Sequence, residues 1–314
     1  MSGQTGERVV VVVPVFERPT AVLEALDSVA AQSRPPDELV IVDDGSTDDT
    51  AERVARWLET TTGSFPTQLV RQPNRGVSAA RNRGVEAAGS SDWVACLDSD
   101  DLWPREYLKA HLDVLRTRPS AVASSSDKES TDVPTGRRRR VSRSWVERDA
   151  TRGIARRGPP GVSNTLLHAG HLAAVGGFPE HLRTAEDLDL MLRLSRRGPW
   201  LYVPETSATY RHRLGEARNE APSLGHAHGD RRRTRAEVLD AFREAVSLEE
   251  PTLAREVGDL AARQWARAGR QFEAAGRSED AIDCFDRALA ERPVDLRSRW
   301  SRSRLRSRLG RGPS

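Results

Sequence analysis

Three acidic residues lie within four positions in the segment L-D-S-D-D-L-W, residues 97–103, directly after an apolar run. Carboxylates packed this closely repel one another unless a cation neutralises them. Mg²⁺ and Mn²⁺ prefer hard oxygen ligands and can also bridge the oxygens of a diphosphate. Asp98, Asp100 and Asp101 therefore predict a divalent-metal site. A capped helix start, with Ser99 or Asp100 as the N-cap, is the alternative interpretation.

Two more carboxylates, Asp43 and Asp44, follow the apolar residues of I-V-D-D-G-S-T-D, residues 41–48, before a glycine turn and a helix start. One of them could accept the N3–H of a uracil ring, a donor that lies between two carbonyls. Thymine presents the same edge, so this contact would not exclude it. Turn and cap chemistry explains the same pair without any ligand. The pair is thus a candidate base-binding site, with a structural turn as the alternative.

A third acidic pair, Glu186 and Asp187, stands in T-A-E-D-L-D-L, residues 184–190. The pattern predicts a helix from Ala185 to Arg196, and the helix dipole favours negative charge in its first turn. That is the structural explanation of the pair. The functional explanation is that one of the two carboxylates acts as a general base, which removes a proton from an acceptor hydroxyl or thiol.

The segments that carry these acids alternate between strand and helix in the first third of the chain. The predicted strands are 9–13, 39–42, 68–71 and 93–97, and the predicted helices begin near 20, 47, 77 and 102. This order predicts an α/β fold with a mostly parallel sheet flanked by helices. Ligands bind outside the carboxyl ends of such strands, where Pro14–Phe16, Asp43–Asp44 and Asp98–Asp101 would gather.

The remaining segments define the predicted domains. Residues 117–160 lose the periodicity and contain the run Arg137–Arg140, so we expect a variable surface insertion. For the arginine run, a solvated loop is favoured over a phosphate-binding loop. Order resumes at residue 161, and the first domain spans residues 1–213. Residues 214–235 are polar and predict a linker, and residues 236–314 predict a helical region.

Composition narrows the class of protein. The 314 residues suffice for one large domain and a small appendage. The 49 Lys and Arg nearly cancel the 46 Asp and Glu, and a net charge of +3 argues against a nucleic-acid partner. Cys96 and Cys284 predict two reduced thiols. The sequence contains neither a signal peptide nor an apolar run long enough to span a membrane, so we expect a cytoplasmic protein.

Taken together, the motifs resemble the family 2 glycosyltransferases, which have the GT-A fold. The resemblance covers residues 8 to 213 and consists of six segments in order, each of them weak by itself. They are V-V-V-V-V-P-V-F-E-R-P (9–19), L-V-I-V-D-D-G-S-T-D (39–48), N-R-G-V-S-A-A-R-N-R-G (74–84), V-A-C-L-D-S-D-D (94–101), G-G-F-P-E-H-L-R-T-A-E-D-L-D-L-M-L-R-L (176–194) and Y-R-H-R (210–213). The resemblance implies a nucleotide-diphosphate sugar as the donor and Mn²⁺ or Mg²⁺ as the cofactor.

The resemblance also implies roles for individual residues on the nucleotide side. Pro14 and Phe16 would line the base pocket, with Phe16 stacked on the pyrimidine. Asp44 would hydrogen-bond the base, and the turn at Gly76 would let the backbone approach the nucleotide. Arg81 would lie near the base or the diphosphate.

On the metal side, the resemblance implies that Asp98 lies by the ribose. Asp100 and Asp101 would hold the metal, Asp101 most directly. Asp187 would be the base of an inverting displacement, with Glu186 beside it at the substrate.

The chain departs from the family's pattern at three of these positions. Phe16 stands where Tyr is commoner and Glu17 where Asn is commoner, and neither change removes stacking. His212 is the implied third contact to the metal or the diphosphate. The family's usual Tyr-Arg-any-His order is shifted by one here, which leaves the His212 assignment open.

The C-terminal region carries a second pattern. Aromatic and small residues recur there at the spacings of a tetratricopeptide repeat: Trp265, Ala268, Gly269, Phe272, Gly276, Ala281, Phe285, Ala288 and Pro293. One full repeat is present, followed by a predicted capping helix over 296–309. A single repeat cannot bury its own face, so we expect it to pack on the catalytic domain or on another chain and to dock a peptide or protein. An ordinary helical hairpin is the alternative.

The sequence therefore predicts a metal-dependent inverting glycosyltransferase. We expect a nucleotide-diphosphate sugar as the donor, with UDP favoured, and a polysaccharide, lipid, peptide, protein or metabolite as the acceptor. One alternative is a nucleotidyltransferase, which would need a Gly-rich, Lys-bearing loop after the first strand; residues 14–20 do not form one. Another is a tetratricopeptide scaffold with a degenerate sugar-nucleotide domain, against which the intact Asp100, Asp101 and Asp187 argue.

Overall fold

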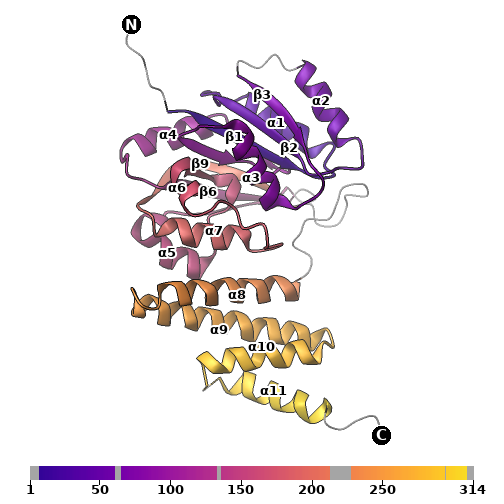
Figure 1. The fold of residues 1–314 in the computed structure, drawn as a ribbon, viewed down its shortest axis with the longest axis vertical. Helices are drawn as coiled ribbons and strands as arrows, with labels where there is room; N and C mark the ends of the chain where they lie inside the picture. Colours follow the sequence, from indigo (N-terminus) through magenta and orange to yellow (C-terminus); the bar gives the residue numbers. More distant parts are fainter. Residues whose placement is uncertain (1–6, 61–64, 133–135, 213–227, 294, 310–314) are drawn as a thin grey trace. The chain divides into compact units, whose positions relative to one another are not determined.

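The computed structural model describes residues 7–60, 65–132, 136–212, 228–293 and 295–309. The chain divides into two compact units, Met1–Ala221 and Pro222–Ser314, and each is considered by itself. The first is an α/β unit and the second is entirely helical within its described residues (Figure 1). The two classes agree with the α/β fold and the all-α appendage that the sequence predicts.

Within the described residues, nine strands form one sheet in the order β3-β2-β1-β4-β8-β6-β9-β5, and β7 pairs with β6. The strands are β1 (Val9–Val15), β2 (Glu38–Asp43), β3 (Thr67–Arg71), β4 (Trp93–Cys96), β5 (Asp101–Leu102), β6 (Ala123–Asp132), β7 (Arg138–Val141), β8 (Thr165–His168) and β9 (Trp200–His212). The first four strands are mutually parallel, whereas β8 runs antiparallel to both of its neighbours. The sheet is therefore parallel in its N-terminal part and mixed in its C-terminal part.

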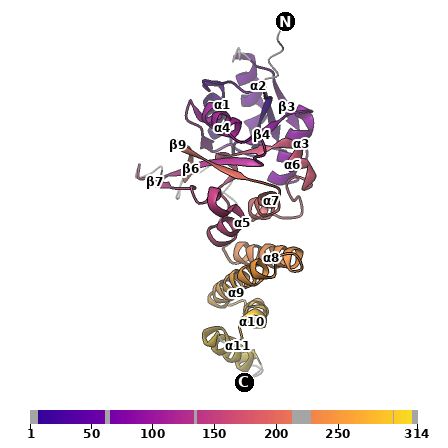
Figure 2. The ribbon, with the colours of Figure 1, turned by 90° about the vertical axis from the view of Figure 1, so that its left-hand side faces the viewer.

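Helices cover both faces of the sheet. They are α1 (Ala21–Ala30), α2 (Thr50–Thr60), α3 (Val77–Ala88), α4 (Tyr107–Arg116), α5 (Val146–Arg157), α6 (Ala169–Ala174) and α7 (Glu186–Ser195), with a 3₁₀ turn η1 (Val162–Asn164). The side chains of β1 alternate between the faces, so that Val11 joins the core under α1 and α4 while Val12 contacts α3. Farther along the sheet, α4 lies over one face of β6 and β9, and α5 lies with α7 over the other (Figure 2).

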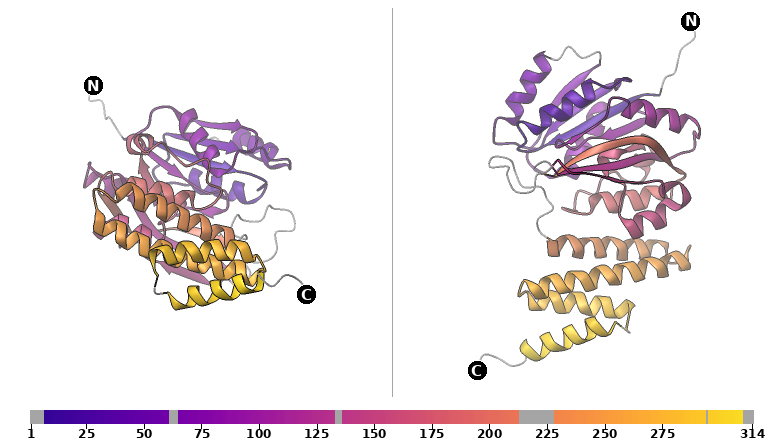
Figure 3. Two further views of the ribbon diagram at one scale, coloured as in Figure 1. Left: turned by 60° about the horizontal axis from the view of Figure 1, so that its bottom comes forward. Right: turned by 180° about the vertical axis from the view of Figure 1, so that it is seen from behind.

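The segment 117–160 differs most from its prediction, because β6 lies inside the sheet between β8 and β9 rather than in a surface insertion. β9 pairs with it over nearly its whole length (Figure 3). Ser124 and Ser125 of β6 are polar but buried. Their burial is tolerated because both hydroxyls are hydrogen-bonded. Ser124 Oγ lies 2.8 Å from His111 Nδ1, and Ser125 Oγ accepts a hydrogen bond of 2.9 Å from Trp200 Nε1. Paired hydroxyls thus replace the apolar alternation from which a strand is normally predicted.

Most of the arginine run 137–140 lies on strand β7. Arg138 and Arg140 lie on β7 and form ion pairs with Glu129 and Asp127 of the neighbouring strand. Asp127 is buried, and its second oxygen accepts the N–H of Arg143 at 3.0 Å. These side chains join two strands of the protein, which agrees better with a structural role than with a free phosphate-binding loop.

The second unit consists of α8 (His228–Val246), α9 (Pro251–Ala274), α10 (Ser278–Glu291) and α11 (Leu296–Leu309) within its described residues. Each helix packs on the next. Helix α8 begins at His228, so residues 228–235 are helical and the predicted linker 214–235 was too long; residues 213–227 are outside the described part of the chain. Gly269 brings α9 against α10, because a Cβ there would lie 2.7 Å from Phe285.

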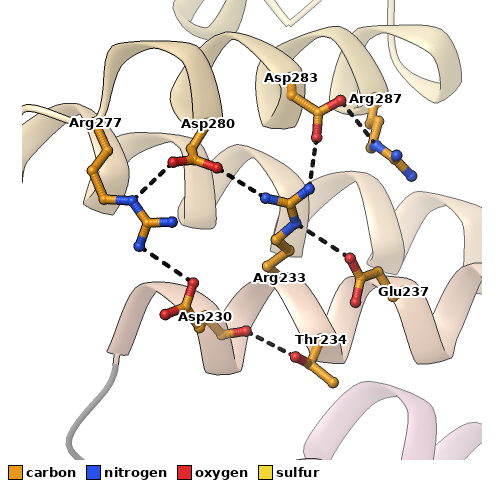
Figure 4. Close-up of polar contacts among 8 residues, drawn as sticks. All are labelled: Asp230, Arg233, Thr234, Glu237, Arg277, Asp280, Asp283 and Arg287. Atoms are coloured by element: carbon orange, nitrogen blue, oxygen red, sulfur yellow. Dashed lines mark hydrogen bonds and ion pairs between the residues drawn. The ribbon is translucent and has the colours of Figure 1, made fainter. Parts of the chain in front are cut away.

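A network of charged residues also joins α8 to α10 (Figure 4). Arg233 of α8 contacts Asp280 at 3.0 Å and Asp283 at 3.3 Å, both on α10. Arg277 precedes α10 and bridges Asp280 to Asp230 of α8. These contacts, with the small residues of α9, explain the helical packing of this unit. The tetratricopeptide assignment and the docking role of the unit stay predictions.

The close approach of α3 to the sheet gives a test of the fold. A Cβ at Gly84 would overlap Val12 of β1 and lie 3.2 Å from Val42 Cγ2 of β2. We expect Gly84→Ala to lower the free energy of unfolding by about 1–2 kcal/mol, because overpacking outweighs the helix propensity gained. Denaturant unfolding of Arg83→Ala, at an exposed position of the same helix, is the control and should change by less than about 0.5 kcal/mol. An equally stable Gly84→Ala variant would contradict this packing.

Candidate active site

Of the three acids predicted to hold a metal, Asp98 and Asp100 lie in the tight connection between β4 and β5, and Asp101 begins β5. The N–H of Asp101 donates to the Asp98 carbonyl at 2.9 Å, and the N–H of Asp98 donates to Ser163 Oγ at 3.1 Å. β5 then pairs with β9, with Asp101 opposite Tyr210. The backbone therefore fixes this loop from two sides, at the carboxyl end of β4.

Asp101 carries a buried carboxylate that the protein does not fully satisfy. Its side chain is 3% exposed, and its Oδ2 has no hydrogen-bond partner among the described residues. Burial raises the pKa of Asp101 well above its usual value, and the neighbouring charges of Asp98 and Asp100 raise it further. Such a group is stabilised either by a proton or by a cation from outside the protein.

Arg81 of α3 connects this acid loop to the start of α7. Its Nη2 donates to Asp98 Oδ1 at 2.7 Å and its Nη1 to Glu186 Oε1 at 3.2 Å. The Arg81 guanidinium is buried and lies 5.2 Å from the centroid of the Phe178 ring. Burial alone would lower the pKa of Arg81, but the carboxylates of Asp98 and Glu186 outweigh it and the net shift is upward. The arginine is thus a permanent cation between two acids of the predicted site.

The next residue on α3, Asn82, holds the segment that leads into α7. Its Nδ2 donates to the carbonyl of Phe178 at 2.9 Å, and its Oδ1 accepts the N–H of Phe178 at 2.9 Å. The chain then enters α7 through Ala185, whose φ of 60° is left-handed. Asp187 follows in the first turn, where its Oδ1 accepts the N–H of Leu188 at 2.8 Å. Consecutive residues of α3 therefore hold Glu186 and the segment that leads into α7.

At the carboxyl end of β1, Pro14 is buried opposite Val42 of β2, and Phe16 is half-buried. The next residue, Glu17, has a φ of 49° and donates its N–H to Ser46 Oγ at 2.9 Å. Pro14 thus lies near the end of β1 and Phe16 directly after that strand, next to the turn that follows β2.

The two acids at the end of β2 form several hydrogen bonds within the protein. Asp43 accepts the N–H of Ser46 at 3.1 Å and forms an ion pair with Arg71 at 3.0 Å. Asp44 accepts hydrogen bonds from Gln72 Nε2 at 2.7 Å and from the N–H groups of Arg75 and Gly76 at 2.9 and 2.8 Å.

Asp44 therefore fixes the loop before α3, and Gly76 begins that helix with a φ of 92°. This geometry supports the structural alternative for the acid pair. A carboxylate has about four acceptor sites, so three hydrogen bonds leave room for one more, and base recognition by Asp44 stays a prediction.

The structure thus brings together Arg81, Asp98 and Glu186 through direct contacts and keeps Asp101 beside Asp98. His212 ends β9, but its side chain lies outside the described residues. Three residues that the sequence did not single out also lie here: Asn82, Ser163 and Lys128. Asn82 follows Arg81 in the N-R-G-V-S-A-A-R-N-R-G segment, which is the signal that could have found it.

The residues present fit a divalent cation only in part. Across the described ranges, no group of three or more His, Cys, Asp and Glu side chains lies close enough to hold an ion by itself. The unpaired Oδ2 of Asp101 is nevertheless a hard, buried, anionic ligand of the kind that Mg²⁺ and Mn²⁺ use. Such ions are commonly held by one or two carboxylates together with substrate phosphates, and the donor set agrees with that arrangement.

Comparison with known protein families identifies the family of this chain. The family model described as glycosyl transferase family 2 matches residues 10–168, a span that includes Asp44, Arg81 and the acid loop of Asp98 to Asp101. The chain belongs to glycosyl transferase family 2. The mixed sheet of this family 2 member, with its flanking helices, is the GT-A fold.

Similar proteins extend the comparison. The chain is 33% identical over 199 residues to the uncharacterized protein y4gI of Sinorhizobium fredii, which covers 62% of this chain and 21% of that protein. This chain thus spans about a fifth of that relative's length. The structure resembles that of S. aureus TarS 1–349 in complex with UDP-GlcNAc, with a TM-score of 0.67, 19% identity and coverage of 90% of this chain and 81% of that one.

A second solved structure is the mannosyltransferase PcManGT from Pyrobaculum calidifontis in complex with GDP-Man and Mn²⁺. Its TM-score is 0.57 at 22% identity, over 96% of this chain and 85% of that one. At these identities the two structures support the fold of this family 2 member. None of the helices in its described residues is long and apolar enough to cross a membrane.

The bridge formed by Arg81 generates a prediction. Arg81→Met should lower the free energy of unfolding by about 3 kcal/mol, because two carboxylates lose their buried counter-charge. We place the loss at the low end of the usual range because Asp98 stays 32% exposed. Arg75→Met, which breaks the exposed pair with Glu180, is the matched control and should cost less than about 1 kcal/mol. Equal losses in the two variants, measured by denaturant unfolding, would contradict the bridge.

Proposed function

We propose that this enzyme transfers a sugar from a nucleotide-diphosphate sugar, preferably a UDP-sugar, to an acceptor hydroxyl or thiol with inversion, and that it requires Mn²⁺ or Mg²⁺. The observation that carries the proposal is the buried carboxylate of Asp101, whose Oδ2 has no partner among the described residues and which stands beside Asp98 and Asp100. A cation is the missing partner of this group.

Asp101 and Asp100 would hold the cation, with His212 as a further candidate ligand. When bound, the cation offsets the negative charge of the diphosphate leaving group. Asp98 is held in place by Arg81 and would face the ribose. A solved structural neighbour with UDP-GlcNAc and another with GDP-Man and Mn²⁺ support a nucleotide sugar and a divalent ion as ligands.

On the nucleotide side, Pro14, Phe16 and Gly76 would border the base. Pro14 lies near the end of β1, Phe16 follows that strand and Gly76 precedes α3. Asp44 links the turn at Gly76 to the end of β2. A free acceptor site on Asp44 would distinguish uracil, which offers an N3–H between two carbonyls. This contact is the reason for proposing UDP over other nucleotides.

Asp187 would be the general base. It lies at the start of α7 next to Glu186, whose carboxylate accepts a hydrogen bond from Arg81. Because Arg81 also binds Asp98, the acid loop and the base are linked through one side chain. A base that removes the acceptor proton as the diphosphate departs would produce inversion in one displacement.

The metal assignment predicts the behaviour of Asp101→Asn. The substitution keeps the shape of the side chain and removes its charge, so transfer and metal-dependent donor binding should be lost while the fold is kept. Calorimetry of UDP with and without Mn²⁺ measures the binding. Asp113→Asn, an exposed carboxylate on α4, is the control and should bind as the wild type does. Near-normal turnover of Asp101→Asn at ordinary metal concentrations would refute the assignment.

The metal assignment also predicts how Asp101→Asn changes the stability of the metal-free protein. A carboxyl group whose folded pKa is raised binds protons more tightly in the folded state, so the metal-free protein loses stability as pH rises through that pKa. Asp101→Asn removes this loss. In chelator at neutral pH the variant should therefore be at least as stable as the wild type, and a clear destabilisation would mean that Asp101 is paired within the protein.

The base assignment predicts a change in rate rather than in donor affinity. Asp187→Asn should lower kcat by about 10²- to 10⁴-fold, the usual contribution of a positioned base, with UDP affinity close to wild type. Glu186→Gln should cost less. With a thiol acceptor, whose pKa is near 8.5, the penalty for Asp187→Asn should shrink. Loss of UDP-sugar binding with an unchanged rate at saturation would instead assign Asp187 to the donor site.

A further inference from the structure

Lysine is rare in this chain, and one of its lysines lies in the candidate active site. Only two of the 49 Lys and Arg residues are lysines. Lys109 is exposed on α4 and pairs with Asp113 one turn away at 2.9 Å. Lys128 is half-buried on β6, the strand that the sequence did not predict. Its surroundings are therefore unlike those of a surface lysine.

The ammonium of Lys128 is held by an aromatic ring rather than by an acid. Lys128 Nζ lies 3.5 Å from the centroid of the Tyr210 ring, within the range of a cation–π contact. Tyr210 is itself fixed, because its hydroxyl donates to Asn164 Oδ1 at 2.8 Å and a Cβ at Gly161 would overlap that hydroxyl. Since Tyr210 pairs with Asp101 across β9 and β5, the ring places the ammonium beside the acid loop.

Lys128 has no counter-ion of its own. Among the described residues it forms no ion pair within 4.0 Å and no hydrogen bond. Burial lowers the pKa of Lys128, the carboxylates of Asp101, Asp187 and Asp98 raise it, and Arg143 opposes them. These carboxylates come from the metal loop and from the start of α7. The ammonium, which lies on the Tyr210 ring, is therefore close enough to these acids to feel their charge.

We propose that Lys128 binds the diphosphate of the sugar donor as a second cation, supplied by the chain itself. The proposal rests on the proposed function, which brings a diphosphate to the loop of Asp98 and Asp101. A compact ammonium that rests on an aromatic ring, with neither an ion pair nor a hydrogen bond among the described residues, suits phosphate oxygens as a point charge. The diphosphate would then meet positive charge from the metal on one side and from β6 on the other. Lys128 is thus a donor-binding residue that no motif of the sequence marks.

The first test compares diphosphates with nucleosides. Binding of UDP, uridine, GDP and guanosine is measured by calorimetry in Mg²⁺ for the wild type, Lys128→Met and Lys109→Met. Lys128→Met keeps the length of the side chain without its charge and should weaken the diphosphates about 10- to 100-fold, the usual effect of losing a charge-assisted hydrogen bond. Affinity for the nucleosides should not change, and Lys109→Met should match the wild type throughout.

The outcomes separate this proposal from the one on which it rests. If the wild type binds neither UDP nor GDP, the proposed function fails. If the wild type binds a diphosphate and Lys128→Met binds it equally well, the proposed function stands and the role of Lys128 is overturned. Equal loss of diphosphate and nucleoside affinity in a folded variant also overturns it, because that result indicates a structural role.

A second test uses the wild-type chain and does not depend on the folding of Lys128→Met. Reductive methylation with ¹³C-formaldehyde labels both lysines, and their NMR signals are assigned with Lys109→Arg and Lys128→Arg. Addition of the diphosphate with Mg²⁺ should shift the Lys128 signal, whereas the matching nucleoside should leave it unchanged. The Lys109 signal is the internal control. A Lys128 signal that does not respond to a bound diphosphate would overturn the proposal.

Discussion

The buried guanidinium of Arg81 connects segments of the candidate site that lie far apart in the sequence. Arg81 binds Asp98, which follows the parallel strand β4, and Glu186, which opens α7. Its charge is required there, because each carboxylate would otherwise be left partly buried without a partner. Arg81 can reach both only because α3 lies tightly on β1 and β2 at Gly84. The position of the acid loop relative to α7 thus depends on how α3 packs.

The charged side chains of the candidate site differ in how many of their hydrogen-bond partners the protein itself supplies. We use this difference to infer which of them bind a ligand. Asp43 and Asp44 are saturated or nearly so by donors of the protein, as expected for residues that fix turns. Asp101 and Lys128, which lie farther along the sheet, are not. Charged groups this far removed from water usually have hydrogen-bond partners, and a ligand can supply those that the protein does not. A metal diphosphate carries both the positive and the negative charge that these two groups lack.

The sequence predicted the parts of the fold with a strong periodic signal. The valine run of β1 and the helix Val77–Ala88 appear at the expected positions, because buried parallel strands and amphipathic helices are the patterns most easily read. The sequence did not predict β6, because hydrogen-bonded serines take the place of its apolar residues. It also did not predict the start of α8, because the first turns of that helix are polar and held by ion pairs. The acids were found by their spacing. Lys128 could not be found from the sequence, because its proposed role depends on a strand pairing that no local pattern encodes.

The central claim is that the acid loop binds a nucleotide diphosphate through a divalent cation, and a crystal structure with UDP and Mn²⁺ tests it most directly. Anomalous scattering from manganese locates the ion independently of any assumption about its ligands. The account predicts one strong peak about 2–2.5 Å from a carboxylate oxygen of Asp101, the range of hard cation–oxygen contacts, with diphosphate oxygens on its other side. A diphosphate bound without manganese, or manganese bound away from Asp101, would contradict it.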